Sequence, residues 1–227
     1  MSFATVVDYW GLADTNHILQ SSSRSATVGG NAQAMDENGD VQCETGWGDA
    51  YEFSSTYKLI NGATETGSGI LLGAQTNGDT NGDTRAKTSL QITTSNSDFP
   101  EIVVSGRTVV GYDSGATTWT PAGISVVGSK MAQGIGVAAG ASSYITGSSV
   151  TASLSIEAVV YGDSGDLVKV AFGGGRQEAS AELSACSATP TATADTEWTL
   201  AQNVSVNSEN TAYQTGTINV FRNVAGA

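Results

Sequence analysis

The chain has 227 residues, of which 22 are acidic and 9 are basic, so its formal net charge is -13. Proteins that hold nucleic acid through its phosphates need clustered Lys and Arg, and nine scattered cations cannot supply such a cluster. With 28 glycines and only 14% charged residues, the composition favours short strands joined by Gly, Asn and Asp turns. The predicted fold class is all-β, an antiparallel β-sandwich or barrel with at most one or two short helices.

The length allows either one large β domain or two domains of about 110 residues, each with its own core. Residues 1–8 lack the basic start and the apolar stretch of a secretory signal. No apolar run approaches the ~20 residues that span a bilayer. We therefore expect a chain that is made and kept in a cytoplasm and has no membrane partner.

Alternation of apolar and polar residues marks the strands. Residues 41–47 and 51–59 both alternate, so 41–59 is predicted to form a hairpin or a tightly connected strand pair. Residues 152–160 give the clearest strand of the second half. A short helix is expected, if anywhere, near 68–72 or 128–131. Further strands are predicted at about 88–95, 101–110, 167–172, 178–184, 198–206 and 215–222.

An approximate internal repeat relates the two halves of the chain. Residues 36–57 can be aligned with 162–183, which places Gly39-Asp40-Val41 on Gly165-Asp166-Leu167. Residues 92–97 resemble 204–208, and a strand containing Gly106 or Gly216 follows each. Two interpretations stay open: a true duplication, or two similar hairpins in one sandwich. The predicted division is a first β half at 1–110 and a second at 150–227, unless both belong to one intertwined domain.

Residues 111–149, between these halves, are rich in Gly, Ala and Ser and nearly free of charge. This composition is too apolar for a solvated linker and too rich in glycine for a rigid core. The segment is predicted either to connect the halves as a loose loop with one short strand at 124–127, or to become ordered against a neighbouring subunit. We expect it to mediate contacts between subunits or between rings.

Candidate catalytic groups are few. His17 is the single histidine, and no nucleophile is recognisably paired with it, so we expect a surface or hydrogen-bonded histidine. Residues 123–127 begin like a Gly-x-Ser-x-Gly elbow but lack the second glycine. Cys43 and Cys186 form neither a zinc ligand set nor a disulfide framework and are predicted to be small apolar strand residues. The chain is predicted not to be an enzyme and to need no cofactor.

Two acidic turns resemble oxygen-ligand calcium loops, because carboxylates and an amide recur two residues apart. They span 36–40 and 79–83, and the better candidate ligands are Asp79, Asn81 and Asp83. Neither turn continues to the glutamate at loop position 12 of an EF-hand, since Trp47 and Leu90 stand there. Asn-Gly is also the usual centre of a type I′ hairpin turn, which is the favoured interpretation of both.

The four tryptophans are dispersed, which favours core packing over a sugar-binding platform. They are Trp10, Trp47, Trp119 and Trp198. Five arginines are isolated along the chain and are predicted to be ion-pair partners across an interface. They are Arg24, Arg85, Arg107, Arg176 and Arg222.

Several segments resemble structural proteins of tailed bacteriophages and prophages, of the tail tube type. The similarity covers mainly residues 15–110 and is carried by Ala34-x-Asp36-Glu37-Asn38-Gly39-Asp40-Val41 and by Ser97-Asp98-Phe99-Pro100-x-Ile102. The run from Leu19, the segment 67–73 and the stretch 89–107 contribute as well. The resemblance implies a β-sandwich or barrel subunit with one helix at its flank, assembled into stacked rings around a channel for the genome.

The leading hypothesis is therefore a non-enzymatic virion protein that is assembled in the host cytoplasm. Its expected partners are itself, in a trimeric or hexameric ring, other tail proteins, and DNA in transient passage. A negative wall would let DNA move without phosphate contacts, so we expect carboxylates to cluster on one concave face. The alternatives are a capsid decoration or tail-terminator protein, and a carbohydrate-binding β-sandwich with exposed Trp119 or Trp198.

Overall fold

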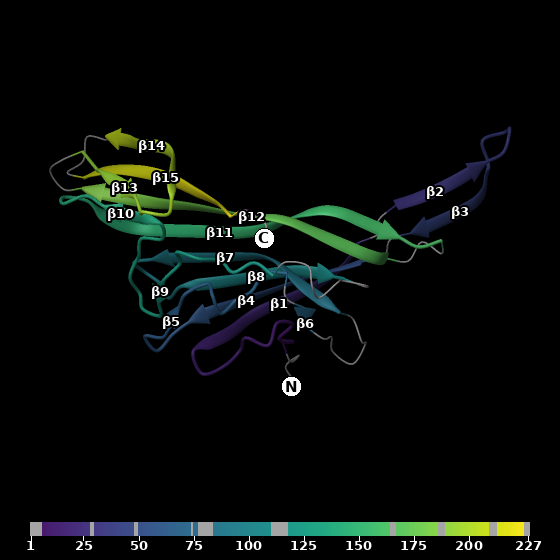
Figure 1. Cartoon of the computed structure of the whole chain (residues 1–227), viewed down its shortest axis with the longest axis horizontal. Helices are drawn as coiled ribbons and strands as arrows, with labels where there is room; N and C mark the ends of the chain where they lie inside the picture. The colour runs from purple at the N-terminus through teal and green to yellow at the C-terminus, as the bar shows by residue number, and fades with distance from the viewer. Residues whose placement is uncertain are drawn as a thin grey trace.

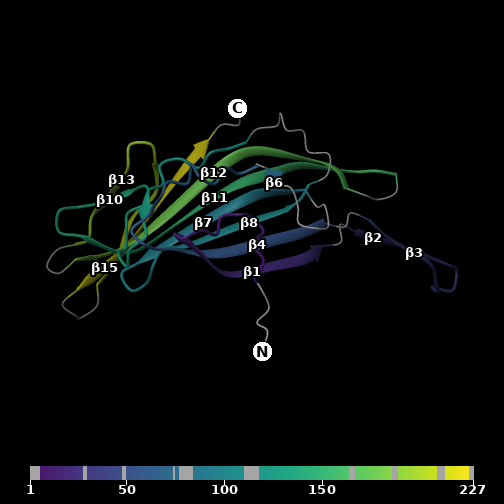
Figure 2. The ribbon, with the colours of Figure 1, turned by 90° about the horizontal axis from the view of Figure 1, so that it is seen from below.

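The computed structural model describes residues 6–27, 30–47, 50–73, 75–76, 84–109, 118–163, 167–185, 189–208 and 213–224. Within these ranges the chain is all-β, as predicted, with antiparallel pairing throughout and no helix, including at 68–72 and 128–131. One sheet of nine strands forms the body of the molecule, and its strands lie side by side in Figure 2. The flanking helix implied by the family resemblance is absent from this part of the chain.

The nine-stranded sheet has the order β1-β4-β8-β7-β11-β12-β15-β14, and the short β6 pairs with the start of β7 (Figure 1). Its strands have the following bounds: β1 His17–Thr27, β4 Ala50–Leu59, β6 Gln75–Thr76, β7 Arg85–Ser95, β8 Glu101–Thr108, β11 Tyr144–Tyr161, β12 Leu167–Ala185, β14 Thr199–Ser208 and β15 Gln214–Val224. Since β7 pairs with β11, the two halves of the chain share one continuous sheet.

Alternation gives this sheet two unlike faces. The inner face carries apolar side chains that pack into one core, among them Tyr57, Ile92 and Ile102, all fully buried. The outer face carries polar side chains, chiefly Ser and Thr, which are half-buried or exposed. Because apolar groups gather on one side only, the sheet needs a second layer over its inner face.

That second layer consists of loops and two short two-stranded sheets. β5 Thr64–Glu65 pairs with β9 Val126–Val127, and β10 Val137–Ala139 pairs with β13 Ala192–Ala194. The N-terminal segment joins them through Trp10, whose indole Nε1 donates to the Val104 carbonyl at 2.9 Å. These segments complete the sandwich-like packing over the inner face.

The internal repeat is present in the strand register. In the first half β1 pairs with β4, and β2 Gly30–Met35 pairs with β3 Val41–Trp47; in the second half β11 pairs with β12. Leu19 faces Tyr57 as Ile145 faces Leu183, an offset of 126 residues on both strands (145 minus 19, and 183 minus 57). This offset is the one that places 36–57 on 162–183 in the sequence alignment.

The strand order repeats as well. The first half runs β1-β4-β8-β7 across the sheet and the second runs β11-β12-β15-β14, so a long hairpin is followed in each by a shorter one paired in the same way. In the shorter hairpins Ile92 faces Ile102 as Val206 faces Gly216, an offset of 114 (206 minus 92, and 216 minus 102). Gly106 is therefore equivalent to Val220 and not to Gly216. We call the two halves the N-unit and the C-unit.

Each unit sends a two-stranded ribbon beyond the sheet, and both ribbons project toward the same end of the molecule (Figures 1 and 2). The N-ribbon is β2 with β3, a sheet of its own. The C-ribbon is the outer part of the β11–β12 hairpin, residues 155–161 and 167–173, which pair only with each other. Ala32 faces Thr45 as Ala158 faces Ala171, so the ribbons are also equivalent at the offset of 126.

Two predictions were wrong, one about which strands pair and one about where a strand ends. Residues 41–59 do not form a hairpin, because β3 pairs with β2 while β4 pairs with β1 and β8. The strands predicted separately at 167–172 and 178–184 are one strand, β12, which runs through the three glycines at 173–175. Glycines usually interrupt strands, but Gly175 is required here because the Trp119 ring lies 2.4 Å from where its Cβ would be.

Candidate functional site

His17 lies at the start of β1 between two carboxylates. Its Nδ1 is 3.1 Å from Asp14 Oδ1, and its Nε2 is 3.3 Å from Glu65 Oε2. Glu65 is buried and also accepts the Gly67 N–H at 2.8 Å. The histidine therefore ties the start of β1 to β5 in the layer over the inner face, as a hydrogen-bonded histidine.

Asp8 fastens the N-terminal segment in the same way. Its carboxylate accepts hydrogen bonds from the N–H groups of Trp10, Gly11 and Ala13 and from Tyr57 Oη. Partial burial alone would raise the pKa of Asp8, but these hydrogen bonds outweigh it and hold the pKa below its usual value. Burial and the same carboxylate raise the pKa of Tyr57. The group serves to position Trp10 on the core.

The calcium candidates Asp79, Asn81 and Asp83 lie outside the described residues. The other acidic turn, 36–40, joins β2 to β3 as a hairpin turn, with Asp36 N–H donating to the Asp40 carbonyl at 2.9 Å. It is not of the predicted type I′, because Gly39 has a positive φ of 85° and Asn38 does not. Across the described ranges, no group of three or more His, Cys, Asp and Glu could hold a metal ion. Cys43 is a free, exposed residue of β3, and Cys186 is not among the described residues.

Three tryptophans belong to the core, which removes a key expectation of the carbohydrate-binding alternative. Trp10, Trp119 and Trp198 are 3%, 8% and 7% exposed. Trp119 packs against Gly175, and Trp198 packs against Gly136, where a Cβ would lie 2.5 Å from the ring. Neither Trp119 nor Trp198 is therefore a platform for a sugar.

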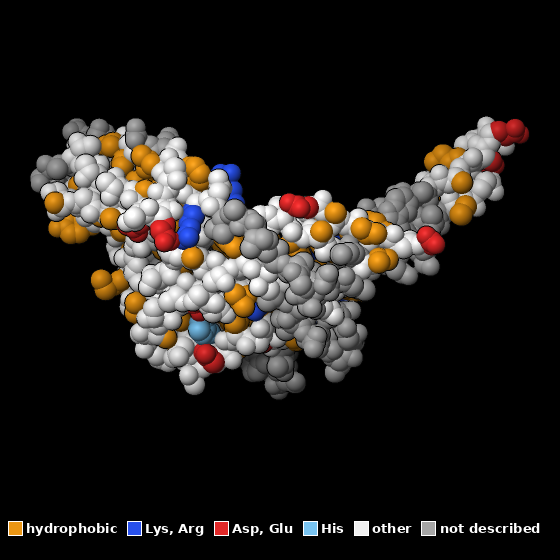
Figure 3. Space-filling view, viewed as in Figure 1, with side chains coloured by type: hydrophobic (Ala, Val, Ile, Leu, Met, Phe, Trp, Pro, Cys, Tyr) orange, Lys and Arg blue, Asp and Glu red, His pale blue; other side chains and the backbone are white. Residues whose placement is uncertain are grey.

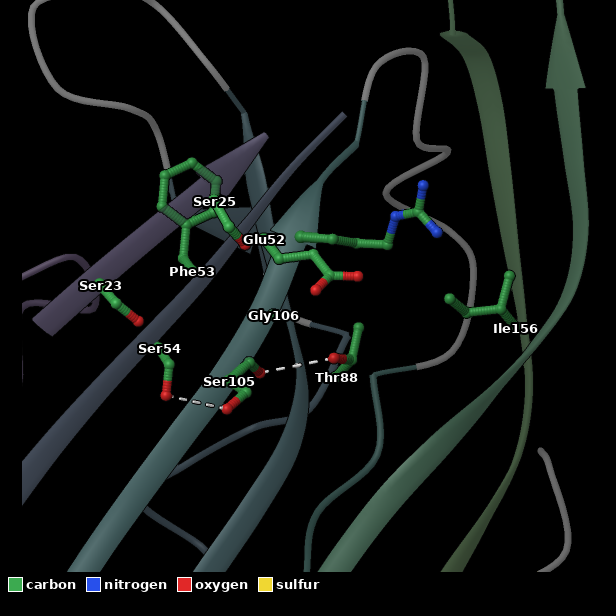
Figure 4. Close-up of a pocket in the computed structure, with 10 residues that line it drawn as sticks. Ser23, Ser25, Glu52, Phe53, Ser54, Thr88, Ser105, Gly106 and Ile156 are labelled. Atoms are coloured by element: carbon green, nitrogen blue, oxygen red, sulfur yellow. Dashed lines mark hydrogen bonds between the residues drawn. The ribbon is translucent and has the colours of Figure 1, made fainter. Parts of the chain in front are cut away.

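The outer face of the sheet is hollowed, and the hollows are lined by hydroxyl groups. One of about 350 Å³ lies over β1, β4, β8 and β7 (Figure 4). There Ser105 Oγ donates to Ser54 Oγ at 3.2 Å, and Thr88 Oγ1 reaches the Ser105 carbonyl at 3.5 Å. Two more hollows of similar volume lie over β11, β12, β15 and β14. In the first hollow these hydroxyls are therefore engaged with one another and with the backbone.

Charges on the outer face are mixed, so the expected clustering of carboxylates is not found on the described part of it. Each cation there lies beside a carboxylate. Lys58 forms an ion pair with Asp98 at 2.7 Å, and Arg176 forms one with Glu178 at 2.6 Å. Arg107 is the register partner of Glu52 in the β4–β8 pair.

Carboxylates gather instead on the N-ribbon, whose tip carries Asp36, Glu37 and Asp40 above the exposed Met35 and Val41 (Figure 3). Isolated two-stranded ribbons are marginally stable in water, so such a projection favours a role in contacts.

The arginines predicted to pair across an interface mostly find partners within the chain. Arg222 bonds Glu197 at 2.6 Å, in addition to the Arg176 pair. Arg24 stacks on the Tyr51 ring at 3.8 Å, and Arg85, which is 4% exposed, lies 5.1 Å from the Phe53 ring. These arginines therefore make their described contacts within the subunit itself.

The segment predicted to mediate contacts supplies core residues instead. Within its described part, 118–149, Trp119, Ile124, Val126, Ile135 and Val137 are buried in the core. Trp119 also bridges to Leu72 through two backbone hydrogen bonds of 2.9 Å. Residues 118–143 therefore cover the inner face of their own subunit, and 144–149 belong to β11 of the sheet.

The two edges of the nine-stranded sheet are candidate contact surfaces that were not predicted from the sequence. β1 and β14 are the terminal strands, and each pairs with a single neighbour on one side, β4 and β15. Neither contains Lys or Pro, two residues that commonly protect a free edge. β1 shows little alternation, but continuing the repeat upstream at the offset of 126 matches Ser22, Ser23 and Ala26 with Ser148, Ser149 and Ala152 and would have indicated it.

No protein-family model matches the chain, and no curated protein matches it. None of the described segments forms a helix long and apolar enough to cross a membrane.

Proposed function

We propose that the protein is a non-enzymatic virion structural subunit of the tail tube type, which assembles with copies of itself into stacked rings. The observation that carries this proposal is the pair of open edges, β1 and β14, at opposite ends of one duplicated sheet. Unlike surfaces at the two ends of a subunit join head to tail and close into a ring when the rotation between copies allows. A chain with two units gives a ring with twice as many units as chains, so three chains make six.

In this proposal the hydroxyl-lined face of the sheet lines the channel, because loops already cover the opposite face. Each described cation of the outer face stands beside a carboxylate, so DNA would find few free positive groups to hold its phosphates. The projecting ribbons would reach toward the next ring and would carry acidic groups at the tip of the N-ribbon.

Negative-stain images of the purified protein test this function. The proposal expects rings or tubes, and a strictly monomeric protein retained on a glycan column would contradict it. The alternative within a virion, a decoration or terminator protein, would give rings or trimers that bind a capsid or a tail end without stacking on one another.

A further inference from the structure

The junction between the two units inside one chain is a pattern for the contact between two chains. β7, the last strand of the N-unit sheet, pairs antiparallel with β11, the first strand of the C-unit sheet. By the repeat, β14 is the equivalent of β7, and β1 is the equivalent of β11. We infer that β14 of one copy pairs antiparallel with β1 of the next copy, in the register of the β7–β11 junction.

The register follows from the two offsets. Within the chain Thr151 faces Gln91 and Val150 faces Ile92. Subtracting 126 from the β11 position and adding 114 to the β7 position turns Thr151–Gln91 into Ser25–Ser205. The neighbouring pairs, obtained in the same way, are Ser23 with Asn207 and Arg24 with Val206.

The edges are shaped to accept this pairing. β1 has a bulge at Gln20, and a bulge disrupts the ladder locally, so regular pairing along β1 resumes at Ser21. The equivalent bulge in β11, at Thr146, leaves the strand free to pair with β7 over residues 147–153. The corresponding stretch of β1 begins at Ser21, beyond its own bulge. On β14 the residues 205–208 are in regular register with β15, and no described strand pairs with their other side.

The side chains at these positions agree with a continued outer face. Ser25 and Ser205 are exposed in the isolated subunit, as are their equivalents Thr151 and Gln91. Val206, which is 43% exposed, would be covered by the neighbouring β1. Pairing would also satisfy the backbone groups that each edge leaves open, which is the main energetic reason for strand addition.

This inference deepens the proposed function, since it names the surface that a second copy binds. It rests on the self-assembly of the chain and does not require that the assembly belong to a virion. The test is a cysteine pair, Ser25→Cys with Ser205→Cys, in a Cys43→Ser, Cys186→Ser background. Directly opposite Cα atoms of antiparallel strands are about 4.5–5.5 Å apart, within disulfide range. Mild oxidation should then give a ladder of covalent multimers.

Two matched pairs serve as controls. Thr151→Cys with Gln91→Cys repeats the same geometry inside one chain and should give an internal disulfide in a monomeric band. Ser25→Cys with Asn207→Cys is displaced by two residues along the strand and should give no ladder. A ladder from the displaced pair that equals that of the matched pair would overturn the register.

The outcomes separate this inference from the proposed function. Rings in the images without a ladder from the matched pair would overturn the β14–β1 junction and leave ring assembly standing. A ladder without rings or tubes would support the junction and contradict the tail tube function. A protein that stays monomeric at high concentration and gives no ladder would overturn both.

Charged side chains at positions 25 and 205 test the β14–β1 pairing without oxidation. Like charges directly opposite on neighbouring strands destabilise pairing, and opposite charges favour it. Ser25→Glu with Ser205→Glu should weaken self-association several-fold, and Ser25→Lys with Ser205→Glu should restore it. Equal association of the two double variants, with unchanged melting of the subunit, would contradict the predicted pairing.

Discussion

Gln20 in β1 and Thr146 in β11 are the extra residues of the same β-bulge, 126 positions apart (146 minus 20). A bulge is a local departure from regular pairing, so its recurrence at equivalent positions of the two long hairpins indicates that they share their register there. The relationship extends beyond the sheet, because the ribbons repeat a second irregularity, at Ala34–Met35 and at Val160–Tyr161. The chain is thus built from two copies of one β unit.

Gly106 is predicted to be intolerant of any side chain. A Cβ there would lie 2.1 Å from the Ala86 carbonyl oxygen and 2.5 Å from the Trp10 ring, and the backbone of β7 cannot move aside cheaply. We expect Gly106→Ala to lower the free energy of unfolding by about 1–3 kcal/mol in urea titrations. Gly69→Ala is the control, since its Cβ would meet only Glu65 at 3.4 Å; an equal loss in both variants would contradict the account.

The Asp8 carboxylate is predicted to stabilise the fold in a pH-dependent way. Its pKa in the folded chain is held below the usual 3.8, so the ionised form contributes stability above that pH, and the contribution is lost as the pH falls through the lowered value. We expect Asp8→Ala to reduce the free energy of unfolding by about 1–2 kcal/mol at pH 7, allowing for partial exposure.

The same carboxylate gives a comparison at low pH. The difference in unfolding free energy between the wild type and Asp8→Ala should shrink as the pH falls below 3.8, because the unfolded chain takes up the proton near that pH and the folded chain only at its lowered pKa. Tyr57→Phe removes the hydrogen bond that Tyr57 Oη donates to Asp8. In that background the loss of unfolding free energy caused by Asp8→Ala at pH 7 should be smaller. A difference that is constant from pH 7 to pH 2.5 would exclude this role.

Removal of residues 118–149 is predicted to unfold the subunit. The segment supplies Trp119, Ile124 and Val126 to the core, so its loss would expose the inner face of the sheet. Circular dichroism and limited proteolysis should both report loss of the native fold. Trp119→Ala, a smaller change, should cost about 3–5 kcal/mol. A deletion variant that melts cooperatively near the wild-type temperature would show that the segment is dispensable for folding.

Chelation is predicted to leave the protein unchanged. The turn at 36–40 is closed by its own hydrogen bonds, with Asp36 accepting from Asn38 N–H and Gln42 Nε2, so its side chains are engaged without a cation. The same turn chemistry is expected at 79–83. A melting temperature that falls by many degrees on addition of a calcium chelator, and recovers with calcium, would instead assign a site to Asp79, Asn81 and Asp83.

Sequence patterns predicted strands well where one face is buried. β4 alternates because its inner side chains are buried in the core, and it was expected from the sequence. The strand expected at 152–160 lies within β11, but the alternating buried part of β11 begins at Ser148, which the sequence placed in the connecting segment. β1 is an edge strand with hydroxyl side chains on most positions, so burial imposes little pattern on it. Pairing was harder still: alternation alone does not choose between β2 and β4 as the partner of β3, although the hairpin turn predicted at 36–40 indicates β2.

The open edges β1 and β14, on which the proposed function rests, could not be predicted from local sequence patterns either. An open edge is a property of strand order, and strand order follows from which hairpins stack side by side. The repeat does supply that information indirectly, since two equivalent units in one sheet must leave an unmatched strand at each end. Net charge was a weaker guide, because the described carboxylates lie on the ribbon tip and beside cations and not on one wall.

Head-to-tail assembly of duplicated subunits is tested most directly by two properties of the native assembly. These are its mass and its rotational symmetry in electron micrographs. The account predicts rings that show twice as many similar units as chains, with three chains giving six projections around a channel. A monomer, or a closed two-fold dimer that buries β1 against β1, would contradict it.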